Sequence, residues 1–296
     1  MKKAVFKGVA TALITPFTDG AESVDFSAFE KLIDFQIKNS ADALVISGTT
    51  GESPVLSRDE KISMFREAVK IADGRIPVIA GTGSNNTEEA VKKSNDAEKQ
   101  GVNGLLIVTP YYNKCSQQGL IDHYFYIADR VSTPVIIYNV PSRTGVTIKA
   151  DTYKALAEHK NIVAVKEAST DMSEYIKASA LCGDDFVFYS GNDDLAVSMM
   201  SYGGKGIISV ASNIIPDVMH SIAEYCLNND FTNASVLHKK YLKLMNSLFC
   251  DINPAPIKAA CKMLFNTNDN MRLPLTPVSQ ANKDVIKSVL EEYHLI

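Results

Sequence analysis

The chain has 296 residues, of which 46% are hydrophobic and 22% are charged, and its formal net charge at pH 7 is −4. This length and composition fit a globular protein with a substantial core, either two small domains or one large α/β barrel. A nucleic-acid partner is unexpected, because binding phosphates requires a basic face and the chain has no long block of lysines and arginines.

The spacing of the cysteines and the pattern of the N-terminus indicate the cellular compartment of the protein. The five cysteines are widely spaced and form no C-x-x-C pair, which favours free thiols in a reducing compartment over disulfides or a zinc site. The apolar stretch "VATALI" that follows Lys2 and Lys3 is too short and too interrupted for a secretory signal. No apolar run approaches the roughly twenty residues needed to cross a bilayer. We therefore expect a cytoplasmic protein with no membrane partner.

Eight short apolar runs alternate with segments of helical pattern. In chain order the predicted strands span residues 9–14, 43–47, 77–80, 104–108, 134–138, 162–166, 186–190 and 206–210. This alternation predicts an α/β protein built as a closed (β/α)₈ TIM barrel. A doubly wound open sheet is the alternative, although "GTGSNN" at 81–86 does not complete the G-x-G-x-x-G pattern of dinucleotide-binding folds.

The helical segments carry recognisable boundaries. Ser57 and Glu60 match a capping box ahead of apolar residues at 62, 65 and 69, another stripe occupies positions 26, 29, 33 and 37, and a third helix closes at Gly101. From Pro216 onward the pattern is only helical. We expect the last barrel helix to end near Asn228, so that residues 1–228 form the barrel and residues 229–296 a helical appendage packed on it.

In such a barrel the residues that follow the strands gather at one rim, where active sites lie. The second, fourth and fifth strands run into "GTTGES" (48–53), "TPYYN" (109–113) and "YNVPSRTG" (138–145). The sixth ends in Lys166, and the last two run into "SGNDD" (190–194) and "SVASN" (209–213). This rim is the predicted site.

Lys166 closes the β-branched run "IVAV", which is typical of a strand buried on both faces. Burial can lower the pKa of a lysine from about 10.4 by several units, which frees the amine to attack a carbonyl. Alternatively, Lys166 reaches solvent or pairs with Glu167. The strand pattern alone leaves both interpretations open.

The companions of Lys166 favour imine chemistry. No histidine stands at a strand end, so the available proton relays are the phenols Tyr111, Tyr112 and Tyr138. The "GTTGES" loop can point backbone N–H groups at an anion, and Arg143 offers a planar donor fork for a carboxylate. Each of these residues also has an ordinary alternative role in packing, a tight turn or a surface ion pair.

Together these segments closely resemble the dihydrodipicolinate synthase / N-acetylneuraminate lyase family, class I aldolase-like barrels, and within it the dihydrodipicolinate synthase branch. The resemblance runs through "ITPF", "GTTGES", "IPVIAGTGSNNT", "TPYYN", "YNVPSRTG", "VAVKEAS", "GIISVASN" and "RLPLTP". It implies a Schiff-base lyase that condenses pyruvate with L-aspartate 4-semialdehyde to 4-hydroxy-tetrahydrodipicolinate, in diaminopimelate and lysine biosynthesis. It implies no cofactor beyond the covalent imine, and in particular no metal, flavin or nicotinamide.

The resemblance also implies catalytic roles for four residues. Lys166 would form the imine with pyruvate, and Tyr138 would donate and accept protons while it forms. Thr49 and Tyr112 would complete a proton relay with Tyr138, with Tyr112 reaching into the site of a neighbouring subunit. The implied assembly is a homotetramer made of two tight dimers.

Four more residues would bind the substrates. Thr50, with the N–H groups of its loop, would hold the pyruvate carboxylate, and Arg143 would position the semialdehyde carboxylate. Gly191 and the Ile208 carbonyl would line the pocket.

Feedback-inhibited relatives bind L-lysine at the tight-dimer interface. The positions that match this effector site here are Ser53, Pro54, Arg58, Lys61, Asn85, Glu89 and Tyr111. Those relatives carry histidines where this chain has Arg58 and Lys61, and two cations would repel the effector ammonium although Glu89 is retained. The hypothesis is weak or absent inhibition by L-lysine.

Three other functions remain open. A lyase acting on N-acetylneuraminate or a 2-keto-3-deoxy sugar acid would share Lys166, but it would favour hydroxyl-binding residues where this chain has Arg143. A phosphate-binding isomerase is disfavoured by the two carboxylates of "SGNDD". A catalytically dead keto-acid sensor would be expected to lack Lys166 or Tyr138. Cys115, near the tyrosine loop, is expected to be an inert thiol.

Overall fold

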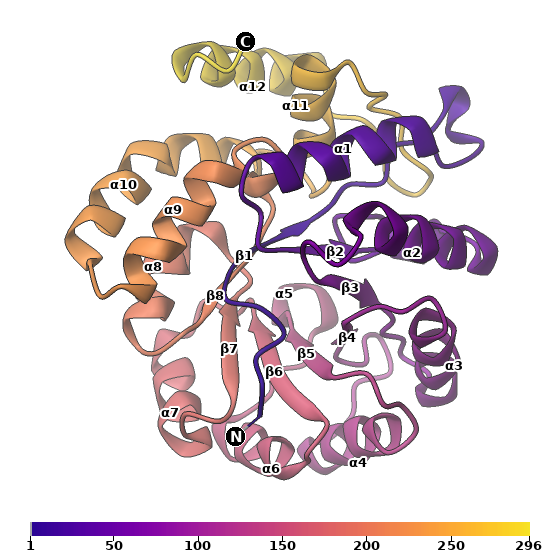
Figure 1. The fold of residues 1–296 in the computed structure, drawn as a ribbon, viewed down its shortest axis with the longest axis vertical. Coiled ribbons are helices and arrows are strands. Elements are labelled where there is room, and N and C mark those ends of the chain that lie inside the picture. Colours follow the sequence, from indigo (N-terminus) through magenta and orange to yellow (C-terminus); the bar gives the residue numbers. More distant parts are fainter. Residues whose placement is uncertain (1) are drawn as a thin grey trace.

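The computed structural model describes residues 2–296 and shows a closed barrel of eight parallel strands surrounded by helices (Figure 1). The strands are β1 (Gly8–Ala12), β2 (Ala43–Ile46), β3 (Val78–Gly81), β4 (Gly104–Val108), β5 (Val135–Asn139), β6 (Ile162–Glu167), β7 (Val187–Ser190) and β8 (Gly206–Ser209). Each strand pairs with the next, and β8 pairs with β1. The predicted barrel is confirmed, and the open sheet is excluded.

Helices connect the strands and form the outer ring. They are α1 (Phe26–Lys38), α2 (Arg58–Ala72), α3 (Thr87–Glu98), α4 (Gln117–Ala128), α5 (Pro141–Thr144), α6 (Ala150–Glu158), α7 (Met172–Cys182), α8 (Ala196–Ser201) and α9 (Pro216–Leu227). The predicted capping box is confirmed, since Ser57 Oγ accepts from the Glu60 N–H and the Glu60 carboxylate accepts from the Ser57 N–H at 2.8 Å. Within residues 2–296, every helix is too short or too polar to span a bilayer.

The core has an inner and an outer part. The lumen is filled by side chains such as Ala10, Val45 and Ile136, together with Tyr138. Near its amino-terminal end the Phe6 ring stacks on Tyr189, with ring centroids 4.2 Å apart. A larger apolar cluster lies between the strands and the helices. Because the lumen is packed below, space for chemistry is left at the carboxyl ends of the strands.

Three further helices follow the barrel: α10 (Phe231–Ser247), α11 (Ala255–Phe265) and α12 (Gln280–Glu292). Helix α10 packs against α8 and α9, and α11 and α12 lie beyond α1 (Figure 1). Farther along, the Arg272 guanidinium bonds both Glu60 oxygens, at 2.6 and 2.8 Å. The appendage therefore packs on the barrel, while a domain division at residue 228 stays a prediction.

Candidate active site

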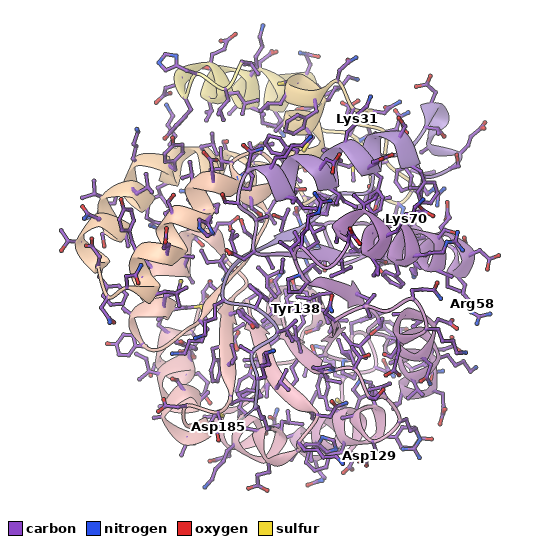
Figure 2. The ribbon with its side chains drawn as sticks, viewed as in Figure 1. Lys31, Arg58, Lys70, Asp129, Tyr138 and Asp185 are labelled. Carbon is purple, nitrogen blue, oxygen red and sulfur yellow. The ribbon has the colours of Figure 1, made fainter. Side chains whose placement is uncertain are left out.

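Lys166 and Tyr138 face each other inside the barrel. They are direct register partners on β6 and β5, so both side chains project from the same level of the sheet. Their exposed fractions are 5% and 7%, and Lys166 Nζ lies 4.5 Å from the centroid of the Tyr138 ring. Figure 2 shows Tyr138 within the ring of strands. A buried amine and a phenol are thus adjacent where the strands end.

Apart from the Tyr138 ring, the Lys166 amine has no close polar partner in the part of the chain that the structure describes. Among residues 2–296 it forms no hydrogen bond and no ion pair, so the alternative in which it pairs with Glu167 is wrong. Glu167 instead accepts from Asn139 at 3.0 Å, from the Tyr153 hydroxyl at 2.5 Å and from the Ser169 N–H at 2.7 Å. Burial, reinforced by Glu167, raises the pKa of Tyr153 well above its usual value. Neighbouring residues on a strand point to opposite faces, which explains this separation.

A cavity of about 340 Å³ opens beside Tyr138. Its walls include three predicted catalytic or substrate residues and four predicted effector residues, namely Thr49, Tyr138 and Arg143, and Ser53, Pro54, Lys61 and Tyr111. Gly48, Gly81, Gly83 and Lys93 also line it. The cavity therefore runs from Tyr138 toward the predicted effector positions, and neither Lys166 nor Thr50 is among its lining residues.

The "GTTGES" loop is held partly by the C-terminal region. Thr50 is 3% exposed, and its Oγ1 accepts from Asn253 Nδ2 at 3.1 Å. The Asn253 carbonyl in turn accepts from Arg143 at 3.2 Å. Asn253 therefore links the two residues expected to bind substrate carboxylates. No local pattern indicates this contact, because about two hundred residues separate Asn253 from Thr50.

Gly191 lies next to Lys166, and neither Gly191 nor Ile208 lines the cavity beside Tyr138. The Gly191 N–H donates to the Glu167 carbonyl at 2.7 Å, and a Cβ at this position would meet Ala168 Cβ at 2.6 Å and Lys166 Cε at 3.1 Å. Ile208 is fully buried on β8. Gly191 thus leaves room for the lysine side chain.

Tyr112 stands apart from the other predicted site residues. Its side chain is 92% exposed, and its backbone is left-handed with φ +70°. Within one chain it contributes nothing to the cavity beside Tyr138.

Four of the seven predicted effector positions line a neighbouring cavity of about 730 Å³, namely Pro54, Arg58, Lys61 and Glu89. Asn85 lies outside both cavities. Arg58 donates two bonds to Asp96, at 2.6 and 2.7 Å. Figure 2 shows Arg58 at the outer edge of the molecule.

The expected cationic character of this cavity rests on Lys61, as the sequence suggested, and on Lys93 in place of Arg58. Arg58 is neutralised by Asp96, and Glu89 pairs with Lys92 at 2.8 Å. Lys61 and Lys93 are half-buried and form no ion pair among residues 2–296. Burial, together with the charge of Lys93, lowers the pKa of Lys61 to about 8.

The loops after β7 and β8 do not offer a phosphate site. Asp193 is 3% exposed, and its carboxylate accepts from the N–H groups of Val210 and Ala211 at 3.1 and 2.9 Å. These are the donors that a bound phosphate would need. Burial raises the pKa of Asp193. The phosphate-binding alternative therefore lacks its anion pocket.

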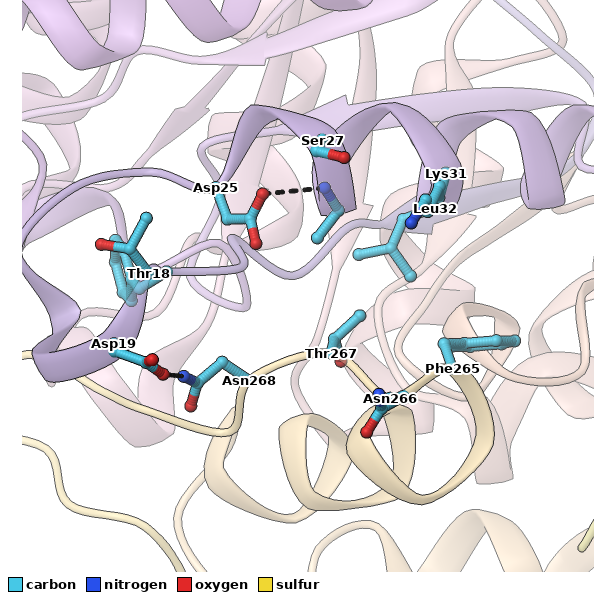
Figure 3. Close-up of a pocket in the computed structure, with 12 residues that line it drawn as sticks. Thr18, Asp19, Asp25, Ser27, Lys31, Leu32, Phe265, Asn266, Thr267 and Asn268 are labelled. Carbon is cyan, nitrogen blue, oxygen red and sulfur yellow. Dashed lines mark hydrogen bonds between the residues drawn. The ribbon is translucent and has the colours of Figure 1, made fainter.

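Other features contribute no chemistry that we can assign. A cavity of about 590 Å³ lies between α1 and the segment after α11, lined by residues such as Asp25, Lys31 and Asn268, but by none of the predicted site residues (Figure 3). All five cysteines are free thiols, and burial raises the pKa of Cys115. Within residues 2–296, no three His, Cys, Asp or Glu side chains gather as a metal site.

Comparisons with a family model, with curated relatives and with solved structures all point to the same protein family. The model of the dihydrodipicolinate synthetase family matches residues 5–293. Among curated relatives, 4-hydroxy-tetrahydrodipicolinate synthase 1 of Clostridium acetobutylicum is 47% identical over 293 residues, which cover 99% of each chain.

Solved structures agree with this match. Dihydrodipicolinate synthase from Aquifex aeolicus is 44% identical with a TM-score of 0.95, and the alignment covers 98% of this chain and 99% of that one. The chloride-inhibited dihydrodipicolinate synthase from Acinetobacter baumannii, solved in complex with pyruvate, is 39% identical with a TM-score of 0.95 over 98% and 99% of the two chains.

Proposed function

The chain belongs to the dihydrodipicolinate synthetase family, and we propose that it condenses pyruvate with L-aspartate 4-semialdehyde to form 4-hydroxy-tetrahydrodipicolinate. The observation that carries this proposal is the buried Lys166 amine, which has no hydrogen bond or ion pair among residues 2–296 and lies beside the Tyr138 ring, in a chain matched over nearly its whole length. The reaction belongs to lysine and diaminopimelate biosynthesis.

The chemistry begins at Lys166. Its neutral amine attacks the keto carbon of pyruvate, and the resulting carbinolamine loses its oxygen as water once that oxygen is protonated. Tyr138 delivers this proton, since its ring already lies beside the amine. The proton returns to Tyr138 through Thr49 and through Tyr112 of a neighbouring subunit. Thr49 lines the same cavity as Tyr138.

The imine then makes the carbon–carbon bond. Its protonated nitrogen accepts the electron pair released when a methyl proton of pyruvate leaves, and the enamine attacks the aldehyde carbon of the second substrate. The amine of that substrate next attacks the imine carbon, which closes the ring and releases Lys166. The nitrogen of Lys166 is the electron sink, so the proposed reaction uses no metal and no organic cofactor.

Two carboxylates must be held during these steps. Thr50 and the N–H groups of its loop bind the pyruvate carboxylate, and Arg143 binds the semialdehyde carboxylate. The support for this assignment is the chain of contacts from Thr50 through Asn253 to Arg143, which holds the two anion-binding residues in one framework. Gly191 and the Ile208 carbonyl complete the walls around the imine.

The proposed assembly is a homotetramer of two tight dimers in the cytoplasm. The almost fully exposed Tyr112 supports the dimer, because an aromatic side chain held outward in a left-handed turn is suited to a partner surface. The five free thiols fit a reducing compartment.

The test is turnover of alternative substrates. Purified enzyme is incubated with pyruvate and L-aspartate 4-semialdehyde, and product formation is followed by coupling to a dihydrodipicolinate reductase. Parallel reactions contain N-acetylneuraminate or a 2-keto-3-deoxy sugar acid, with pyruvate release as the readout. Rapid condensation with no sugar-acid cleavage is expected. Cleavage of a sugar acid without condensation would contradict the proposal.

A further inference from the structure

The molecule contains a second buried lysine, far along the chain from Lys166. Lys258 on α11 and Glu52 in the loop after β2 both have side chains with 0% exposure, and Lys258 Nζ lies 2.6 Å from Glu52 Oε1. The same ammonium donates to the Asn270 carbonyl at 2.6 Å and lies 4.3 Å from the centroid of the Phe17 ring. Burial lowers the pKa of Lys258, and Glu52 opposes that shift.

The two buried lysines have opposite surroundings. The Lys258 ammonium has two hydrogen-bond acceptors and the face of the Phe17 ring around it, whereas Lys166 has no hydrogen-bond partner among residues 2–296. A fully paired ammonium cannot act as a nucleophile without first breaking those bonds. Lys258 is therefore not a second imine lysine, and its role must lie in what it holds.

Lys258 holds Glu52, a strained residue in the loop of residues 48–53 that is proposed to bind the pyruvate carboxylate. Glu52 lies two positions after Thr50 and has a left-handed backbone with φ +54°. This conformation is unfavourable for a residue with a side chain and persists only where the surroundings impose it. Glu52 Oε1 bonds Lys258, and Oε2 accepts from the Arg272 N–H at 3.3 Å. Both anchors come from the C-terminal region.

Stability alone is a weak reason for such a pair. The cost of removing two charges from water is comparable to their attraction, and two apolar residues of similar volume often stabilise a protein as well or better. An ion pair, however, fixes direction and distance, which apolar packing does not. The loop of residues 48–53 is the segment whose exact shape matters, because its N–H groups and Thr50 are proposed to hold a carboxylate.

We infer that Lys258 is a positioning residue for catalysis, which acts through Glu52 to hold the loop of residues 48–53 in the shape that binds the pyruvate carboxylate. This inference rests on the proposed function. It assigns the C-terminal helical region a role in substrate binding: α11 and the segment after it serve as the support against which the loop is fixed.

The first test is Lys258→Met, which keeps much of the side-chain volume and removes the charge. We expect the KM for pyruvate to rise at least about 10-fold, with a much smaller change in kcat and in the KM for the semialdehyde, because the lost interaction serves pyruvate binding. The rate of borohydride trapping at low pyruvate should fall in parallel. Lys258→Met also leaves Glu52 unpaired, so a lower Tm is expected.

The double variant Glu52→Gln/Lys258→Met separates positioning from simple stability, and it serves as the test if the single variant does not fold. It removes both charges, so its Tm should recover toward that of the wild type, while the KM for pyruvate stays raised. If both the Tm and the KM for pyruvate returned to their wild-type values, the inference would be overturned. That result would show that the ion pair only stabilises the fold and that uncharged residues can take its place.

Lys262→Met is the matched control. Lys262 lies one turn further along α11 and pairs with Asp269 at 2.7 Å, without contact to the loop. The KM of Lys262→Met for pyruvate should equal that of the wild type. An equal rise of this KM in Lys262→Met and Lys258→Met would overturn the inference. Wild-type enzyme is trapped with pyruvate in the same series: failure there would contradict the proposed function, whereas normal trapping with unchanged Lys258→Met kinetics would contradict this inference alone.

Discussion

At the scale of single residues, the account depends on the proton carrier beside Lys166. Tyr138→Phe keeps the buried ring next to the amine and removes only the hydroxyl, so the fold should be preserved. We expect kcat to fall by about 10²–10⁴-fold, the range typical of general acid–base groups. Steady-state kinetics and thermal unfolding measure this. A kcat within twofold of the wild type would show that another group carries the proton.

The effector positions lead to a second prediction at this scale. Below pH 8 Lys61 is cationic and stands with Lys93 in the cavity, while Glu89 is already paired with Lys92. We therefore expect no inhibition by L-lysine at low millimolar concentration at pH 7. As the pH rises through about 8, Lys61 loses its charge and the repulsion weakens, so any lysine binding should appear only there.

Initial rates at increasing L-lysine, measured at pH 7 and pH 9, test this. Inhibition at pH 7 by low millimolar lysine or less would refute the hypothesis. Lys61→Met gives a matched comparison, because it removes the contribution of Lys61 to the repulsion at every pH and leaves Lys93 in place.

At the scale of elements, the end of β6 and the start of the loop after β7 are packed so closely that only glycine fits at 191. Gly191→Ala would place its Cβ 2.6 Å from Ala168 Cβ and 3.1 Å from Lys166 Cε, so the lysine must move. We expect kcat to fall at least about tenfold, since small misplacements of a catalytic group are costly. The double variant Gly191→Ala/Ala168→Gly removes the shorter contact and should recover part of the activity. Equal kcat for Gly191→Ala and wild type would contradict this view of the site.

The elements also show which parts of the fold can be predicted from the sequence. Strands buried on both faces leave continuous apolar runs, and a helix start such as Ser57 leaves a local capping pattern, so both could be located. Contacts between distant segments leave no such pattern: Asn253 with Thr50, Lys258 with Glu52, and Arg58 with Asp96 became evident only in the folded chain. For this reason the pairing of Arg58 with Asp96 was not expected from the sequence.

At the scale of the whole molecule, Tyr112 is predicted to act in the site of its partner. The residue-level resemblance predicted this role, and the exposed side chain fits it. Mixing Lys166→Ala with Tyr112→Phe subunits provides that test. A mixed tight dimer contains one complete site, because the Tyr112→Phe subunit keeps its own Lys166 and receives Tyr112 from the other subunit.

Each variant alone should be nearly inactive. In an equal mixture that has exchanged subunits, about half of the randomly formed dimers are mixed, and one of the two sites in each mixed dimer is complete. The mixture should therefore recover about a quarter of wild-type activity. Sedimentation measures the assembly in the same samples. Absence of recovery in a mixture shown to contain mixed dimers would place Tyr112 outside the partner's site.

The central claim is that Lys166 forms an imine with pyruvate. The most direct measurement is incubation with pyruvate, reduction with borohydride, and location of the modified peptide by mass spectrometry, with Lys166→Ala as the control. The account predicts one modified residue, Lys166, and none in the control. Absence of labelling in folded wild-type enzyme, or labelling of another lysine such as Lys258, would contradict it.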